Sequence, residues 1–516
     1  MRSFGRRAFL RGAVATTGGV LVSGPLEAVL GSAVAAAPAG PLGPVADLRD
    51  GVVRLHLPPG FQYRSFHDTD TLWNPAPAVP PPPPPALQPP SPPVVLPDGT
   101  VLPGRHDGMA AFPSPDGNVW LVRNHEINGP VTAAFGPGTP YDSRAGGGTT
   151  TVLVTPRGEV VDAFTSLNGT QMNCSGGEMP WGSWISCEET VNGPDTTPDF
   201  TGVSNAPLQR PHGFIYEVPA GGQSSRQPIK HAGRFAHEAA AYSPDEGIVY
   251  LTEDNFEFPS GFYRYIPPEN PMTAGHLSDG GVLQMLKVVG ADQAHLEATQ
   301  VIGATYAVEW RTIAQPFPGP PGGDGSFPEV TDNKAALTFV GNQGRALGAA
   351  HFSRLEGATY TRGEIYFTST QGGGAAETGP EPVTGYGNGT GQVWSYDPTT
   401  STLTCRYQAP DAATLELPDN ITARNNRGTI VLCEDGPGDN YIRGLTRDAS
   451  LFDIALNRLR NNNPNTVNGQ VVHISRFGEE FAGATFSPDG GTLFVNIQAS
   501  RAVTFAIWGP WGRLGV

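Results

Sequence analysis

The stretch FAHEAAAYSPDEGIVYLTEDN, residues 235–255, contains two short alternating apolar runs around a Ser-Pro-Asp turn. β-branched and aromatic residues with this period, separated by turn residues, are typical of two antiparallel strands. An acid stands at either end of the strand pair, Glu238 and Glu253, fifteen residues apart. The stretch therefore predicts strands whose middle forms a core and whose ends carry carboxylates.

The same pattern occurs six times in the chain. Most copies begin with a polar or small residue and contain a turn with Gly, Asp or Asn. An alternating strand follows the turn and ends with a polar residue. The fifteen-residue spacing also recurs, in the pairs Cys174–Glu189 and Asp419–Glu434. The copies are HDGMAAFPSPDGNVWLVRNHE from His106, NCSGGEMPWGSWISCEE from Asn173, AHEAAAYSPDEGIVYLTED from Ala236, RLEGATYTRGEIYFTST from Arg354, LPDNITARNNRGTIVLCED from Leu417 and FAGATFSPDGGTLFVNIQ from Phe481.

These repeats predict an all-β fold, a six-bladed β-propeller with insertions, because radial closure protects the open edges of repeated sheets. The chain has 516 residues with 67 Gly and 52 Pro, which favours turns over helices. Insertions are expected around residues 259–331 and 437–467, and the one helix-like segment is TRDASLFDIALNRLRNN, residues 446–462. A pair of β-sandwiches is the alternative fold.

The N-terminal region is expected to precede the propeller, which should span residues 103–516. RRAFLRG, with Arg6 and Arg7 before a weakly apolar run, resembles a twin-arginine signal, and Ala33-Val34-Ala35 fits a cleavage site. Residues 1–35 are therefore expected to be a signal peptide, and residues 36–102 a segment with a proline-rich stretch at 74–97. An exported protein, periplasmic or extracellular and with no membrane span, is the prediction.

The net charge of the chain indicates which classes of binding partner to expect. There are 48 acids against 32 Lys and Arg, a formal net charge of −16. Nucleic acid is not an expected partner, because phosphate backbones are met by clustered basic residues. Bound cations are compatible with this charge, and so is simple solubility.

In a propeller the innermost strands line the central channel, so the polar ends of the six copies should converge on one axis. Crowded carboxylates repel one another and lose hydration, and bound cations resolve that conflict. All-oxygen positions suit Ca²⁺, whereas a thiolate among carboxylates suits a transition metal. The converging candidates are Asp107, His125, Glu126, Cys174, Glu188, Glu189, His237, Glu238, Glu253, Asp254, Glu356, Asp419, Asn420, Glu434, Asp435 and Gln498.

Cysteine usage leaves an alternative open. Cys174, Cys187, Cys405 and Cys433 could form disulfides in an oxidising compartment, and two bridges allow three pairings. Cys174 lies in a Gly-flanked turn, where its thiolate could instead reach a metal.

Several of these motifs together resemble the PhoX-type alkaline phosphatases, which are exported by the twin-arginine route. They are NHE, NCSGGEMPWGSWISCEE, AHEAAAYSPDEGIVYLTED, RLEGATY, LPDN, LCEDG and FAGATFSPDGGTLFVNIQ with VTFAIWGPW, between about Pro103 and Trp511. The resemblance implies a six-bladed propeller with two ferric and three calcium ions at the channel mouth, hydrolysing phosphate monoesters. Small-molecule phosphomonoesters are then the substrates, and a monomer is expected.

Carried over by motif, the resemblance implies that Cys174, Glu189 and Glu238 bind iron and that Arg354 contacts the substrate phosphate. It implies that Glu356 and some of Glu126, Glu253, Asp254, Asp419 and Glu434 hold calcium or complete the cluster. The chain departs from the family pattern in having Leu355 where Pro is usual, and Ala499-Ser500-Arg501 after Gln498 where His-Pro-Gly is common.

Two other functions remain as alternatives. A calcium-dependent propeller lactonase or phosphotriesterase needs few carboxylates and has no use for a thiolate, so a disulfide at Cys174 would favour it. A non-catalytic exported propeller would use calcium only to stiffen the channel, and it gives no reason for an Arg beside Glu356.

Overall fold

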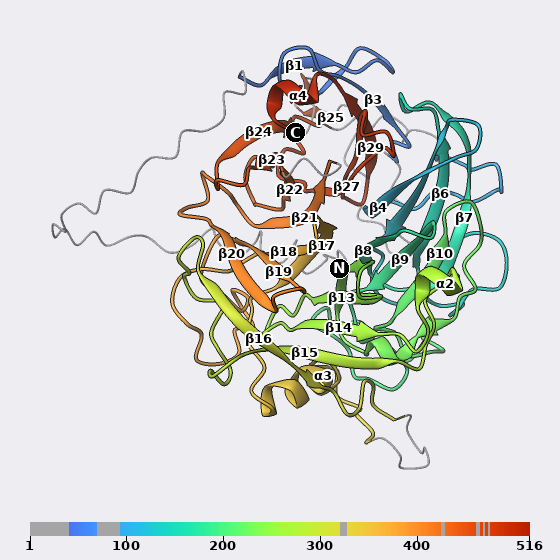
Figure 1. Cartoon of the computed structure of the whole chain (residues 1–516). Coiled ribbons are helices and arrows are strands. Elements are labelled where there is room, and N and C mark those ends of the chain that lie inside the picture. Colours follow the sequence, from blue (N-terminus) through green and yellow to red (C-terminus); the bar gives the residue numbers. More distant parts are fainter. Residues whose placement is uncertain are drawn as a thin grey trace, which may run out of the picture.

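The computed structural model describes residues 41–69, 93–319, 328–424, 429–460 and 475–516, with the backbone of 465–467 and 470–472. The expected signal peptide and residues 74–92 of the proline-rich stretch lie outside the described residues. Strands dominate, and their sheets are arranged around a central axis (Figure 1). The expected all-β, propeller-like architecture is therefore confirmed.

Four blades and one nine-stranded sheet surround the axis. The first blade has β4 (His106–Pro113), β5 (Val119–His125), β6 (Gly147–Val154) and β7 (Val160–Thr170), and the second has β8 (Asn173–Met179), β9 (Ser183–Glu188), β10 (Ile215–Pro219) and β11 (Pro228–Ile229). The third has β21 (Pro418–Ala423), β22 (Ile430–Glu434), β23 (Tyr441–Leu445) and β24 (Leu451–Asn457), extended by β2 (Val53–Leu57) and β1 (Gly43–Ala46). The fourth has β27 (Phe481–Phe486), β28 (Thr492–Ile497), β29 (Val503–Trp508) and β3 (Gln62–Phe66).

The prediction of six separate blades is wrong. The copies that begin at Ala236 and Arg354 share the nine-stranded sheet, in the order β12 (His237–Ser243), β13 (Ile248–Glu253), β14 (Phe262–Ile266), β15 (Val282–Val288), β16 (Thr305–Thr312), β20 (Thr402–Gln408), β19 (Gln392–Asp397), β18 (Glu364–Ser369) and β17 (Leu355–Thr361). β16 pairs with both β15 and β20, so the outer edges of the two copies join. Pairing satisfies edges that would otherwise be exposed. Because β12 and β17 also contact each other, this sheet is nearly closed.

The first strands of the six copies still form a ring. β4, β8, β12, β17, β21 and β27 each contact the next, and β27 contacts β4. A narrow cavity of about 70 Å³ lies between them, lined by polar and small residues such as Ser175, Gly177 and Thr422. The ring brings the ends of all six copies to one axis.

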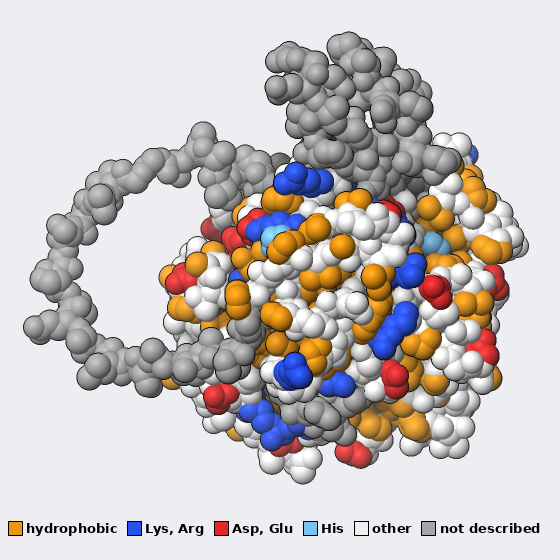
Figure 2. Space-filling model, turned by 90° about the horizontal axis from the view of Figure 1, so that it is seen from above, with side chains coloured by type: hydrophobic (Ala, Val, Ile, Leu, Met, Phe, Trp, Pro, Cys, Tyr) orange, Lys and Arg blue, Asp and Glu red, His pale blue; other side chains and the backbone are white. Residues whose placement is uncertain are grey.

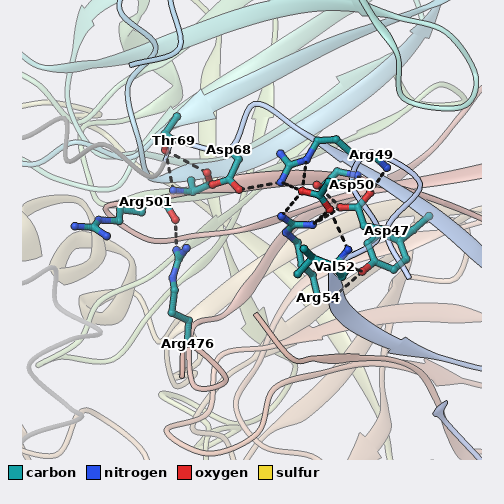
Figure 3. A network of polar contacts seen from close by, with 12 residues as sticks. Asp47, Arg49, Asp50, Val52, Arg54, Asp68, Thr69, Arg476 and Arg501 are labelled. Atoms are coloured by element: carbon teal, nitrogen blue, oxygen red, sulfur yellow. Dashed lines mark hydrogen bonds and ion pairs between the residues drawn. The ribbon is translucent and has the colours of Figure 1, made fainter. Parts of the chain in front are cut away.

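Strands from the beginning of the described chain complete two sheets. β3 pairs with β29, and β2 pairs with β24. Figure 3 shows the polar network that holds this segment: Arg54 contacts Asp47 at 2.9 Å and Asp50 at 2.7 Å, and Arg49 contacts Asp68 at 3.2 Å. The segment thus links the last two copies and helps to close the ring. The domain boundary at residue 103 remains a prediction.

Helices are few among the described residues. They are the 3₁₀ turn Lys230–Ala232, α2 (Pro271–Ala274), α3 (Asn333–Ala346) and α4 (Trp511–Leu514). The helix predicted within residues 446–462 is wrong, because Leu451–Asn457 forms β24 between β23 and β2. Pairing on both sides of this segment overrides its helical preference. None of the described helices is long and apolar enough to span a bilayer.

Apolar side chains fill the space between neighbouring sheets. One such cluster contains Leu55, Val431 and Phe505, all fully buried and drawn from three different parts of the chain. Burying a side chain of this size contributes about 1.5–3 kcal/mol. On the face drawn in Figure 2, acidic and basic side chains are scattered among hydrophobic ones, and neither charge forms a continuous patch.

Candidate metal centre

The inner strands of all six copies begin with the same register. The first residue of each pairs with the last residue of the next strand, in the pairs His106–His125, Asn173–Glu188, His237–Glu253, Leu355–Ser369, Pro418–Glu434 and Phe481–Ile497. A β-bulge follows near this point in each strand, and bulges re-aim side chains. The residue after the first pair is Asp107, Cys174, Glu238, Glu356, Asp419 and, in the sixth copy, Ala482.

A second position also repeats. The residue that follows the second strand of each copy donates its N–H to the carbonyl oxygen of the residue preceding the inner strand, at 2.9–3.1 Å in all six copies. These donors are Glu126, Glu189, Asp254, Thr370, Asp435 and Gln498. Two equivalent positions on a closed ring explain why acids from opposite ends of a strand pair are neighbours. They lie at one end of the axis together with acids from the other copies.

Three groups of side chains have potential ligand atoms within 4.8 Å of one another. They are Glu126, Cys174 and Glu189; Glu238, Glu356 and Asp419; and Asp419, Asp435 and Glu480. All of these residues are buried. The donor sets fit metal ions, since the first combines a thiolate with carboxylates and the other two offer only oxygen.

Glu480 was not predicted from the sequence. It lies directly before β27, at the position that Arg105 and Arg354 occupy in their copies. The sixth copy has Ala482 where the other five have an acid or Cys174, so the adjacent pair Glu479-Glu480 was the available indication. The structure thus adds an acid from the one copy for which the sequence predicted none.

Contacts around Cys174 connect three copies of the repeat. Its Sγ donates to Asp107 Oδ2 at 3.4 Å. Gln498 Nε2 donates at 2.6 Å to Asp107 Oδ2 and at 2.6 Å to Glu126 Oε2. None of the four cysteines, all in the described part of the chain, forms a disulfide. The arrangement that would favour the lactonase alternative is therefore not present.

Arg354 lies beside the second group of acids. Its Nε donates to Asp254 Oδ1 at 3.1 Å, and its Nη2 donates to Asp254 Oδ2 at 2.7 Å and to Glu356 Oε1 at 3.1 Å. The backbone before β17 is left-handed here, with φ of 39°, which is unusual for a residue with a side chain. The next residue, Leu355, which stands where Pro is usual, is fully buried in the core.

Three acids predicted as ligands, Glu253, Asp254 and Glu434, lie outside the three groups, and Asp254 is paired with Arg354. Glu253 accepts from the Gly261 N–H and from Tyr263 Oη at 2.7 Å, and burial raises its pKa. Glu434 contacts Arg443 at 2.9 Å, and burial raises its pKa to about 7. Glu253 and Glu434 are each the last paired residue of their strands, and the next residue, Asp254 or Asp435, occupies the repeating position on the ring.

Two candidate histidines are part of the blades. His125 contacts Thr150 Oγ1 at 2.9 Å and the Gly104 carbonyl at 3.0 Å, and burial lowers its pKa to about 3. His237 is stacked on Phe235 and contacts the Gly233 carbonyl at 2.9 Å, and burial likewise lowers its pKa to about 3. Both rings are thus neutral, and their described contacts are structural.

Glu188 also points away from the groups, into a buried network behind β9. His212 Nδ1 contacts Glu188 Oε1 at 2.6 Å, and His212 Nε2 lies 3.5 Å from Asp142 Oδ2. Burial would lower the pKa of His212, but the charge of Glu188 and the contacts with both acids outweigh it and raise this pKa to about 9.

This network predicts a pH-dependent stability. His212 binds its proton more tightly when folded, so its stabilisation is complete below pH 6.5 and is lost as the pH rises through about 9. His212→Gln is expected to lower Tm at pH 6 and to flatten the decline of Tm between pH 7 and pH 10. His231→Gln, at an exposed histidine that also contacts an acid, is the control. Parallel Tm curves for wild type and His212→Gln would contradict this account.

The fold and the three groups define a β-propeller protein with a candidate metal centre at its axis. A family model described as alkaline phosphatase PhoX matches residues 148–500, more than half of the chain. The chain therefore belongs to the PhoX alkaline phosphatase family. The expected assignment to the phosphoric monoester hydrolases is confirmed.

Two of the solved structures that match this chain are as follows. PhoX from Pseudomonas fluorescens, solved with vanadate as a transition-state analogue, has a TM-score of 0.57 and 17% identity, covering 92% of this chain and 98% of that one. A gluconolactonase from Xanthomonas campestris matches with a TM-score of 0.32 and 12% identity, covering 78% and 86%. No curated protein sequence matches significantly. The first likeness supports the fold over the 92% of this chain that it covers.

Proposed function

We propose that the chain is an exported alkaline phosphatase that hydrolyses phosphate monoesters with an iron–calcium cluster at the mouth of its central channel. One observation carries the proposal: in a chain of the PhoX family, Cys174 lies with Glu126 and Glu189 in one buried group. A thiolate among carboxylates is a donor set for a transition metal. Within the proposal, residues 1–35 direct export by the twin-arginine route, residues 103–516 form the catalytic domain, and the protein is a monomer.

The three groups suggest how metals are divided. Glu126, Cys174 and Glu189 would hold iron, and the two all-oxygen groups, which share Asp419, would hold calcium. Glu238 is grouped with Glu356 and Asp419, so it would lie on the calcium side or bridge to iron. Glu253 and Glu434 are not part of the proposed centre. Bound iron and calcium would supply Lewis acidity and positive charge for the phosphoryl oxygens and the attacking water.

The protein's own residues would bind and orient the substrate. A phosphate monoester needs mainly positioning and charge neutralisation, because its transfer requires little covalent chemistry from the enzyme. Asp254 and Glu356 hold the Arg354 guanidinium in a fixed plane, which lowers the entropy lost when it donates to a phosphate. Gln498, bonded to Asp107 and Glu126, would keep these two carboxylates at a fixed separation.

Hydrolysis of p-nitrophenyl phosphate at alkaline pH tests this function. Activity is expected with calcium present, and removal of calcium by a chelator is expected to abolish it because Glu356 and Asp419 would then repel each other and the substrate. Re-addition of calcium should restore activity. Undiminished turnover after complete calcium removal would contradict the proposal.

A further inference from the structure

A second arginine occupies the same repeat position as Arg354. Arg105 precedes β4 as Arg354 precedes β17, and the carbonyl of each accepts the same backbone hydrogen bond. Both residues have a left-handed backbone conformation, with φ of 49° for Arg105 and 39° for Arg354. β4 and β17 are three copies apart in the six-membered ring, so the two arginines start from opposite sides of the axis.

Arg105 is bound to the ring of acids. Its Nη2 forms an ion pair with Glu126 Oε2, and its Nε donates to the Glu126 carbonyl oxygen at 2.5 Å. The charges of Glu126, Glu480 and Asp107 all act on its guanidinium. β4, which Arg105 precedes, lies in the ring between β27, which Glu480 precedes, and β8, which carries Cys174.

Exposure distinguishes the two arginines. The side chain of Arg105 is 23% exposed, whereas that of Arg354 is 1% exposed. A guanidinium has five N–H donors, and Glu126 engages only part of this set. An anion that arrives from solvent therefore reaches Arg105 with less rearrangement of the surrounding side chains than it needs to reach Arg354.

We propose that Arg105 is a second phosphate-binding residue, which donates to the substrate from the side opposite Arg354. The inference rests on the proposed phosphatase function and deepens it. A monoester dianion has three terminal oxygens, and one guanidinium can pair with at most two of them in a fork. Two arginines on opposite sides therefore select the dianion of a phosphate monoester over a diester, which carries one charge less.

Arg105 could instead act only by positioning Glu126, and the two roles make different predictions. A residue that merely orders a metal ligand would, when replaced, reduce the metal content. A residue that binds phosphate would, when replaced, weaken phosphate binding and raise KM while the metal content stays as in wild type.

The test compares wild type, Arg105→Gln, Arg105→Lys and the control Arg406→Gln, all loaded with metals. Arg406 of β20 pairs with Glu364 of β18 and is 35% exposed, so its replacement removes one charge that does not belong to the ring of acids. The measurements are metal content, the Kd of inorganic phosphate by calorimetry, and KM and kcat for p-nitrophenyl phosphate and for bis(p-nitrophenyl) phosphate.

Arg105→Gln is expected to weaken phosphate binding by about tenfold or more, the range for a hydrogen bond to a charged group, with unchanged metal content. Its preference for the monoester should fall, Arg105→Lys should be intermediate, and Arg406→Gln should match wild type. An unchanged phosphate Kd in Arg105→Gln, or a parallel loss of metal, would overturn the inference. If the wild-type protein bound no metal and hydrolysed no monoester, the proposed phosphatase function itself would be contradicted, separately from the inference on Arg105.

Discussion

Replacing Cys174 by Ser is expected to abolish iron binding and phosphatase activity while the propeller stays folded. A serine hydroxyl stays protonated near neutral pH, so it does not replace a thiolate as a metal ligand. Cys174 lies in the bulge of β8 and its Sγ faces Asp107, so the polar replacement leaves a hydrogen bond in place. Iron analysis, activity and circular dichroism check the three parts of this expectation.

The same substitution at Cys187 is the matched control. Cys187 belongs to the same blade, but it is buried in the apolar core between blades. Burial raises the pKa of its thiol far above the usual value, so it stays protonated. Cys187→Ser is expected to lower Tm and to keep the iron. Full iron content and full activity in Cys174→Ser would contradict the assigned role.

Replacing Asp419 by Asn should have the second large effect. Asp419 is the one residue that the two all-oxygen groups share, so its loss weakens both. Removing an outer partner of a metal ligand typically costs about 10–100-fold, and loss of a shared direct ligand is expected to lower kcat by at least about 100-fold. Bound calcium, measured by elemental analysis, should fall by more than one ion per chain.

Two further variants calibrate this result. Asp435→Asn removes a residue that belongs to only one group, so it should lower bound calcium by less than Asp419→Asn does. Glu253→Gln replaces an acid that bonds within its own sheet and should leave calcium binding intact. Equal calcium loss in all three variants would show that the grouping is wrong.

Much of this arrangement was predictable from repetition. The shared spacing of Cys174–Glu189, Glu238–Glu253 and Asp419–Glu434 identified equivalent copies, and equivalence on a ring implies convergence. The spacing did not settle which of two adjacent acids faces the axis. In a strand, neighbouring side chains point to opposite faces, and Glu434 is turned toward Arg443 within its own sheet. For this reason Asp435, rather than Glu434, joins the central groups.

The repeat pattern predicted neither the nine-stranded sheet nor the role of Glu480. β15 and β16 come from a region that reads as an insertion, and only long-range pairing with β20 turns it into a bridge between two copies. Glu480 lies just outside the sixth copy, two residues before the position that carries an acid or thiol in the other five. A pattern that compares equivalent positions of the copies does not detect a ligand that lies at a different position in one copy.

X-ray absorption at the iron edge of the purified, metal-loaded protein tests the central claim most directly. The claim is that six copies of one strand unit bring distant carboxylates and the sulfur of Cys174 around shared metal ions. The account predicts bound iron with one sulfur among its nearest neighbours and oxygens in the remaining positions. Absence of iron, or iron surrounded only by oxygen and nitrogen, would contradict it.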